Sequence, residues 1–171
     1  MEAAQYIFKT ELGWVGISSS ANGLRRLSLP QQKYTDARRI LNEAGEPASG
    51  IPPALGDIAE RLNLYFKGYK VAFPDKLDLA GATDFQRKVW EATRQIPYGE
   101  TRSYTWVAER VGVLKAVRAA GQALGNNPLP VIVPCHRVIG RDGGLGGYSG
   151  GLELKRYLLW LEASAFMRDR I

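Results

Sequence analysis

The chain has 171 residues, of which 45% are hydrophobic and 23% charged, an ordinary globular composition. Its single cysteine and single histidine exclude an intrachain disulfide and a zinc site built from Cys and His alone. The first residues lack the pattern of a signal peptide, and no apolar run approaches the roughly 20 residues of a membrane helix. We therefore expect a soluble intracellular protein.

The net charge of +6 is unevenly distributed. Residues 1–80 carry ten Lys and Arg against nine Asp and Glu, whereas residues 81–171 carry thirteen against eight. The excess of positive charge in the second half suggests a polyanionic partner for that half.

The first half of the chain predicts an antiparallel sheet of three strands. Runs rich in aromatic and β-branched residues occupy 6–10, 14–17 and 24–29. The Asn22-Gly23 pair before the third run is typical of a tight hairpin turn.

One helix is predicted after this sheet. Gly and Pro residues make 42–53 a loop, and apolar residues at helical spacing then run from Leu55 to Phe66, before Gly68. A junction at Gly81-Ala82 divides the chain into two predicted domains, 1–80 and 81–171.

The second half predicts three helices before the cysteine. Their expected bounds are a cap at Thr83 or Asp84 with a stop at Pro97, a start near Ser103 with a stop at Gly112, and a start near Leu114 with a stop before Asn127. The last two helices, joined by a Gly-containing turn, are a helix-turn-helix candidate.

The outward face of the second of these two helices favours contact with DNA. It carries Arg118 and Gln122, and the small residues Ala119 and Ala123 lie beside them. Such pairs occur in any helical protein, so the basic charge balance of this half is what favours DNA.

The lone cysteine and histidine are neighbours, in Pro134-Cys135-His136-Arg137-Val138. Cysteine reacts as the thiolate, and an adjacent imidazole or positive charge lowers the thiol pKa enough to populate that form. A single cysteine after an apolar run is usually a buried, inert packing residue. The spacing alone therefore favours the packing role over the catalytic one.

The segment from Asn127 to Ile139, Asn-Pro-Leu-Pro-Val-Ile-Val-Pro-Cys-His-Arg-Val-Ile, resembles the active-site signature of the O6-alkylguanine-DNA alkyltransferases. The resemblance extends over residues 83–163. It is carried by these further motifs: Phe85-Gln86, Pro97-Tyr98-Gly99, Ser103-Tyr104, Val117-Arg118-Ala119-Ala120-Gly121, Gly146-Gly147-Tyr148-Ser149-Gly150-Gly151 and Leu158-Leu159-Trp160-Leu161-Glu162.

The resemblance implies an α+β protein with two domains. Residues 1–80 would form a ribonuclease-H-like α/β domain with a small antiparallel sheet. Residues 81–171 would form an all-helical domain that contains a winged helix-turn-helix, binds DNA and accepts the alkyl group.

The resemblance also implies DNA repair by direct damage reversal. The protein would bind double-stranded DNA through the minor groove and rotate an O6-alkylguanine out of the stack. It would then transfer the alkyl group irreversibly to Cys135, once per molecule, with O4-alkylthymine as a further candidate substrate. No cofactor or metal is implied. We expect a monomer in the cytoplasm, on the nucleoid, or in the nucleus of a eukaryote, with no membrane contact.

Roles for individual residues follow from the same resemblance. The implied catalytic residues are the nucleophile Cys135, the base His136, its orienting carboxylate Glu162, Asn127, which organises the cysteine loop, and Tyr104. The lesion base would meet Tyr104, Ser149 and the main chain of Cys135 and Val138. The implied DNA-binding residues are Arg118, which fills the space of the flipped base, with Tyr104, Thr105, Ala119, Gln122 and Arg141.

Several of these residues have an ordinary structural alternative. Tyr104 can be a core aromatic, Arg118 a solvated or phosphate-binding arginine, and Glu162 a solvated carboxylate at a helix end.

Three other function classes remain as alternatives. A non-catalytic lesion-binding relative would lack the acceptor, so Cys135 argues against it. A cysteine hydrolase could use Cys135, His136 and Glu162, but it would turn over repeatedly. A helix-turn-helix regulator would need no reactive thiol.

Overall fold

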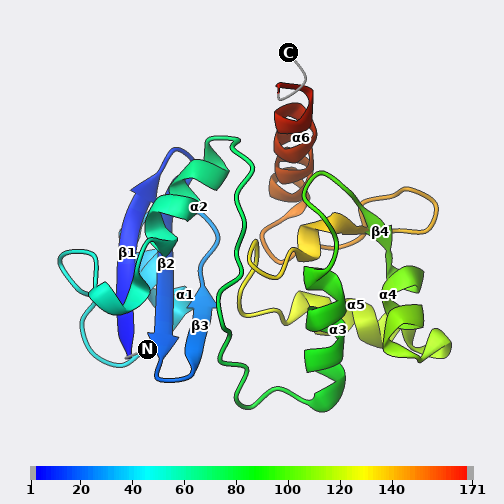
Figure 1. Cartoon of the computed structure of the whole chain (residues 1–171), viewed down its shortest axis with the longest axis horizontal. Helices are drawn as coiled ribbons and strands as arrows, with labels where there is room; N and C mark the ends of the chain where they lie inside the picture. The colour runs from blue at the N-terminus through cyan, green and yellow to red at the C-terminus, as the bar shows by residue number, and fades with distance from the viewer. Residues whose placement is uncertain (1–2, 169–171) are drawn as a thin grey trace. The chain divides into compact units, whose positions relative to one another are not determined.

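The structure of the protein, a computed structural model, describes residues 3–168. The chain forms two compact units, Met1–Ala80 and Gly81–Ile171 (Figure 1). Within residues 3–168, no helix combines the length and apolar character needed to cross a bilayer.

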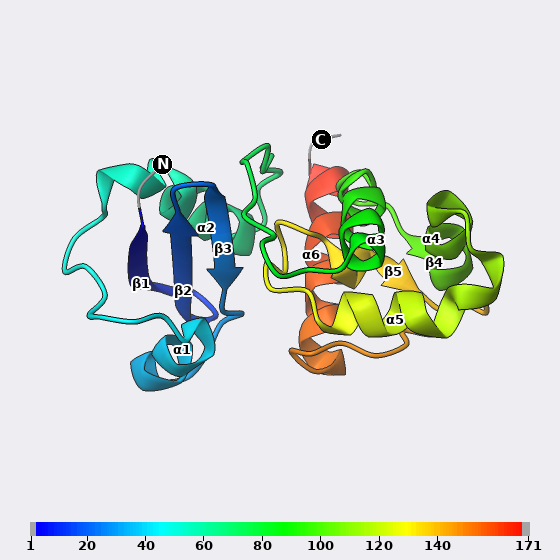
Figure 2. The same cartoon turned by 90° about the horizontal axis from the view of Figure 1, so that it is seen from below.

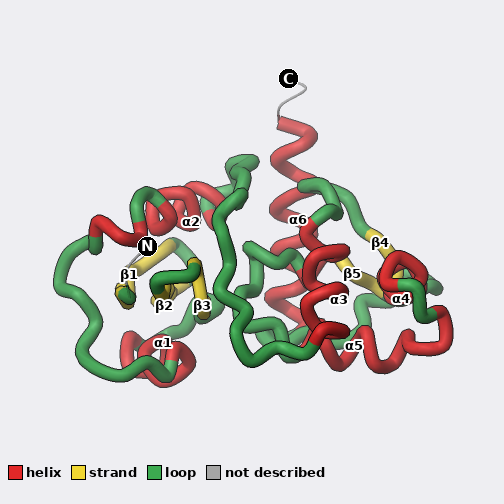
Figure 3. Tube along the Cα trace, turned by 60° about the horizontal axis from the view of Figure 1, so that its bottom comes forward, coloured by secondary structure: helices red, strands yellow, loops and turns green. Residues whose placement is uncertain are grey.

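The first unit is built on the predicted three-stranded antiparallel sheet, which the structure confirms. Its elements are β1 (Ala4–Thr10), β2 (Gly13–Ser20), β3 (Gly23–Leu27), α1 (Tyr34–Leu41) and α2 (Ile58–Phe66). The strands lie in the order β1-β2-β3, and residues 21–22 form the predicted hairpin turn. Helix α1 lies over one face of the sheet and α2 over the other (Figure 3).

A glycine in the central strand lets α1 pack closely on the sheet. A Cβ atom at Gly16 would lie 2.7 Å from the side chain of Leu41, which is fully buried. Leu41, Ala37 and Ile7 form the apolar core on this side of the sheet, with Trp14 against them.

Two details of this unit differ from the sequence-based expectation. Helix α1 was not predicted, because its N-cap residue Lys33 makes no capping hydrogen bond and its buried face is short. Helix α2 begins at Ile58 rather than Leu55, because Pro53–Leu55 forms a separate 3-10 turn.

The second unit contains the predicted helices around a very small sheet. Its elements are α3 (Asp84–Arg94), β4 (Arg102–Ser103), α4 (Tyr104–Val111), α5 (Val117–Gly125), β5 (Val138–Ile139) and α6 (Leu152–Arg168), with 3-10 turns at Leu114–Ala116 and Cys135–Arg137. Helix α3 starts at a capping box in which Thr83 and Gln86 bond reciprocally. Ser103 caps α4, which ends at Gly112 with a φ of 86°.

The expectation that residues 81–171 are all-helical is wrong. Strands β4 and β5 pair in parallel, with Arg102 opposite Val138 and Ser103 opposite Ile139 (Figure 2). Strands of two residues carry no alternating pattern in the sequence, so periodicity cannot reveal them. Their pairing places the start of α4 beside the residues that follow Cys135.

Candidate active site

The cysteine is presented by an irregular loop between α5 and β5. Cys135 is the first residue of the 3-10 turn Cys135–Arg137, and its side chain is 6% exposed. In this loop the β-branched residue Val131 has a φ of 74°, a left-handed conformation that costs roughly 1–2 kcal/mol. The surrounding fold therefore holds the loop in a shape that the local sequence does not favour.

Asn127, at the start of this loop, makes hydrogen bonds to three of its other residues. Its Nδ2 donates to the carbonyl oxygen of Val133 at 2.9 Å and to Cys135 Sγ at 3.2 Å, while its Oδ1 accepts from the Leu129 amide at 2.9 Å. The side chain both closes the loop and stabilises negative charge on the sulfur.

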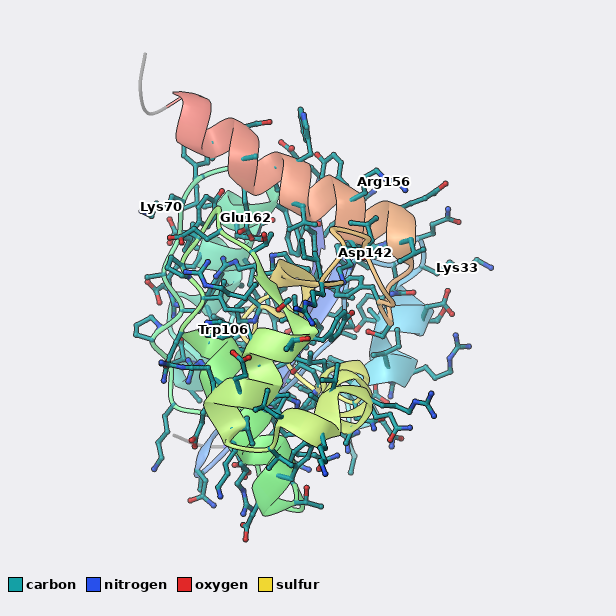
Figure 4. The ribbon with its side chains drawn as sticks, turned by 90° about the vertical axis from the view of Figure 1, so that its right-hand side faces the viewer. Lys33, Lys70, Trp106, Asp142, Arg156 and Glu162 are labelled. Carbon is teal, nitrogen blue, oxygen red and sulfur yellow. The ribbon has the colours of Figure 1, made fainter. Side chains whose placement is uncertain are left out.

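The side chain of His136 belongs to a buried ion-pair cluster with Glu162 and Arg137. Its Nε2 lies 2.5 Å from Glu162 Oε2, and neither side chain contacts solvent appreciably. Arg137 Nε donates to Glu162 Oε1 at 2.8 Å, and the Gly99 amide donates to the same oxygen at 3.0 Å. Figure 4 shows Glu162 on the side of α6 that faces the other elements of this unit.

The ionisation of the cluster follows from burial and from these contacts. Burial raises the pKa of Glu162, but hydrogen bonds and charges from His136 and Arg137 outweigh it and bring the pKa to about 2. Burial lowers the pKa of His136 below its usual value, against the bond to Glu162. The resting cluster therefore holds a carboxylate and a neutral imidazole. Because the carboxylate can only accept, Nε2 carries the ring proton and Nδ1 is the basic nitrogen.

The thiol itself is protonated at rest. Burial raises the pKa of Cys135, and the hydrogen bond from Asn127 and the charge of Lys155 only partly oppose this. The sequence-based expectation of a lowered thiol pKa is not met, because the effect of burial outweighs that of the neighbouring donor and charge. A thiolate must therefore form by proton transfer during the reaction.

Lys155 is a buried cation that the sequence analysis did not identify. It is 0% exposed, and its Nζ donates to the carbonyl oxygens of Val138 at 2.7 Å, Gly147 at 3.1 Å and Leu145. It also lies 3.4 Å from the Tyr104 hydroxyl. Burial lowers the pKa of Lys155 to about 8, so the ammonium form predominates at pH 7. Its position two helical turns before Glu162 was the available signal.

A pocket of about 800 Å³ opens above Cys135. Its lining residues are Tyr104, Val117, Arg118, Gly121, Gln122, Leu124, Gly125, Cys135, Gly146, Gly147, Tyr148 and Ser149. The lining comes from α4, α5, the cysteine turn and the glycine-rich loop before α6. The pocket therefore extends from the sulfur of Cys135 to the surface of α5 on which Arg118 and Gln122 are exposed.

Other predicted site residues lie outside this pocket lining. Thr105 and Ala119 are half-buried, and Arg141 is exposed at the tip of a loop. Val138 is buried, and one lone pair of its carbonyl is taken by Lys155. The outward placement of Ala123 is wrong: it is 3% exposed, and its carbonyl accepts a hydrogen bond from the Trp90 indole.

The chain matches a known family in sequence over this second unit. The family model described as "6-O-methylguanine DNA methyltransferase, DNA binding domain" matches residues 84–164. A relative from Methanosarcina acetivorans, named methylated-DNA–protein-cysteine methyltransferase, is 49% identical over 160 residues, which are 92% of this chain and 97% of the relative.

Solved structures extend the likeness to the whole fold. The Mycobacterium tuberculosis O6-methylguanine methyltransferase superposes with a TM-score of 0.78 at 41% identity, covering 96% of this chain and 94% of that one. The structure of the M. tuberculosis protein OGT in complex with DNA superposes with a TM-score of 0.79 at 41% identity, covering 95% of this chain and 94% of that one. The cysteine at the pocket is followed in the chain by a buried histidine that is paired with a buried glutamate. With this arrangement and with 49% identity along nearly its full length to a named relative, the chain belongs to the methylated-DNA–protein-cysteine methyltransferase family.

Proposed function

We propose that this protein repairs DNA by transferring the alkyl group of O6-alkylguanine to Cys135, irreversibly and once per molecule. The observation that carries the proposal is the position of the Cys135 sulfur. It lies at an 800 Å³ pocket, hydrogen-bonded to Asn127 and next in the chain to a histidine that is paired with a buried carboxylate.

The residues of the site account for each proton moved and each bond made or broken in this reaction. His136 takes the thiol proton at Nδ1 through a water molecule, and Glu162 stabilises the imidazolium through Nε2. Sγ forms a bond to the alkyl carbon while the bond from that carbon to O6 breaks with both its electrons. Guanine then takes up one proton, so the thiol proton is returned in net terms.

The pocket supplies groups that suit a flipped purine. Tyr104 keeps its proton because burial raises its pKa, so its hydroxyl can donate to the lesion base. Ser149 offers a second donor, for O6, and the main chain of Cys135 offers an acceptor for the amino group. The carbonyl of Val138, outside the pocket lining, is a second acceptor for that group, since Lys155 takes only one of its lone pairs. Glycines 146 and 147 leave room for a flat base.

The DNA partner is double-stranded and is approached from the minor groove by α4, α5 and the turn between them, acting as a winged helix-turn-helix. Arg118 at the pocket rim fills the space of the extruded base, since a guanidinium can both stack and hydrogen-bond. Thr105, Ala119, Gln122 and Arg141 complete the contact surface. Binding is sensitive to salt, because phosphate contacts dominate it.

The remaining assignments follow from this function. Residues 1–80 form the ribonuclease-H-like domain, and residues 81–171 the DNA-binding, alkyl-accepting domain. The protein acts as a monomer in the cytoplasm, on the nucleoid, and uses no cofactor or metal.

The experiment that tests this function counts turnovers. A duplex with one O6-methylguanine is supplied in tenfold excess, and loss of the lesion is followed by chromatography of the bases. The proposal predicts that repair stops at one lesion per protein molecule. Continued repair after one equivalent would point to a hydrolase, and binding without repair to a lesion-recognition protein.

A further inference from the structure

The arginine that follows the catalytic pair has the contacts of an active-site component. Arg137 is 8% exposed, and its guanidinium makes three hydrogen bonds, one with each nitrogen. Nε donates to Glu162 Oε1 at 2.8 Å, and Nη2 donates to Glu162 Oε2 at 3.2 Å. Nη1 donates to the Ile96 carbonyl oxygen at 2.8 Å. The Tyr98 ring lies against it, 5.6 Å from ring centre to Cζ.

These contacts fix the carboxylate in two ways. The forked bond leaves Glu162 one orientation, in which Oε2 faces His136 Nε2. The hydrogen bond to the Ile96 carbonyl ties the Arg137 guanidinium to the residues just after α3. Through Arg137, the position of Glu162 on α6 is therefore fixed by the segment after α3.

The charges of the cluster point to a second role. With neutral His136, Arg137 and Glu162 form a balanced buried pair. Without Arg137 the carboxylate would be a buried charge with no counterion, a state that costs several kcal/mol. The imidazole would then take up a proton to neutralise it, and a protonated imidazole cannot accept the thiol proton.

The other groups near His136 do not replace this charge. Lys155 on α6 is positively charged but is bound to three carbonyl groups, and Cys135 is protonated at rest. Burial raises the pKa of the Tyr104 and Tyr148 phenols at the pocket, so both are neutral at pH 7.

We propose that Arg137 is a positioning residue that orients Glu162 and serves as its counterion, so that His136 stays neutral and able to accept the proton of Cys135. The proposal rests on the alkyl-transfer function proposed above. When the thiol proton moves, the thiolate and imidazolium appear beside an already neutral Glu162–Arg137 pair, so the net charge of the buried group does not change.

Because the chain has one histidine, the charge state of His136 can be read directly. The untagged full-length protein is labelled with ¹⁵N-histidine, and the ring nitrogens are followed by NMR from pH 5 to 9.5. The wild-type protein, Arg137→Met and Arg137→Lys are compared. Arg156→Met is the matched control, because it removes an exposed arginine from the same unit (Figure 4). Single-turnover methyl transfer is measured over the same pH range.

The wild-type ring should be neutral at pH 7, with the proton on Nε2. In Arg137→Met at least nine-tenths of the ring should be protonated at pH 7, so transfer at pH 7 should fall at least tenfold. The acid limb of the transfer rate should move upward by the same amount as the histidine titration. Arg137→Lys should restore the neutral ring and most of the rate, and Arg156→Met should match wild type.

The proposal is overturned if wild-type His136 is already charged at pH 7. It is also overturned if Arg137→Met is slow but leaves the histidine titration unchanged, which is the result of a purely structural role. If Arg137→Met does not fold in a thermal melt, Arg137→Gln replaces it, and the wild-type titration decides independently. Absence of transfer by wild type would refute the proposed function alone, because the NMR titration does not depend on activity.

Discussion

His136 Nε2 and Glu162 Oε2 lie 2.5 Å apart inside the second unit, although 26 residues separate them in the chain. The contact joins the cysteine turn to α6, so the base is oriented only when α6 is docked. The reactive centre is therefore a product of tertiary packing, and its properties should respond to changes in α6.

Glu162→Gln should slow methyl transfer about 100-fold, because the imidazolium that forms in the reaction loses its charged partner. Single-turnover rates at pH 7 measure this. Glu153→Gln on the same helix is the matched control, since Glu153 is exposed. A drop of less than threefold in Glu162→Gln would remove the glutamate from the mechanism.

The stability of the protein should fall in acid through the same carboxylate. The pKa of Glu162 is lowered from 4.5 to about 2, so its contribution is complete above pH 4.5 and is lost as the pH falls toward 2. The contribution is roughly 3 kcal/mol. Urea unfolding at pH 7, 4.5 and 3 should show a steeper loss for wild type than for Glu162→Gln. Parallel curves would contradict this assignment.

Asn127→Ala should destabilise the protein by about 2–3 kcal/mol, because it leaves partly buried loop groups without their hydrogen bonds. It should also slow the reaction of Cys135 with iodoacetamide, since the thiolate loses the donor at 3.2 Å. The neighbouring exposed residue offers the control variant Asn126→Ala. Equal effects of the two variants would deny Asn127 any special role.

How far the sequence predicts the fold depends on the range of the interactions involved. The Thr83 capping box, the Asn22-Gly23 turn and the stop at Gly112 are local signals, and the structure has all three. Strands β4 and β5 depend on pairing between residues 36 positions apart, which no local pattern encodes. Helix α1 lacked a capping side chain and was missed for that reason.

The candidate site divides in the same way. The resemblance to a known family brought Cys135, His136, Asn127 and Glu162 into one prediction. The structure places Asn127 against Cys135 and His136 against Glu162. For Lys155 the sequence offers one signal, its position two helical turns before Glu162. It does not reveal the partners of Lys155, which are carbonyl groups from two other segments. The error at Ala123 has the same origin, since the Trp90 indole reaches it from another helix.

Gly146→Ala should reduce transfer at least tenfold. The φ of Gly146 is 68°, and a Cβ atom there would lie 2.5 Å from the Tyr104 hydroxyl oxygen, so the tyrosine must move in the pocket. Overpacking of this kind costs about 1–3 kcal/mol. Gly143→Ala is the control, because Gly143 also has a positive φ, 88°, but lies outside the pocket lining, and a Cβ atom there meets nothing within 4 Å. Thermal melts and transfer rates of both variants check the prediction, which fails if they behave alike.

Arg118→Ala should weaken repair of a lesion in duplex DNA about tenfold while changing the reaction with free O6-benzylguanine less than twofold. The side chain lies at the pocket rim and is exposed, so it can act on the duplex rather than on the base in the pocket. The exposed α6 residue Arg156 supplies the control variant Arg156→Ala. Equal losses on both substrates would rule out the space-filling role.

The most direct test of the account locates the transferred group. The protein is incubated with a duplex that carries one O6-methylguanine, digested and analysed by tandem mass spectrometry, with Cys135→Ser treated in parallel. The account predicts one added methyl group on the Cys135 peptide, saturating at one per molecule, and an unmodified Cys135→Ser protein that still binds the duplex. Methylation at another residue, or a wild-type protein that binds the lesion and stays unmodified, would contradict it.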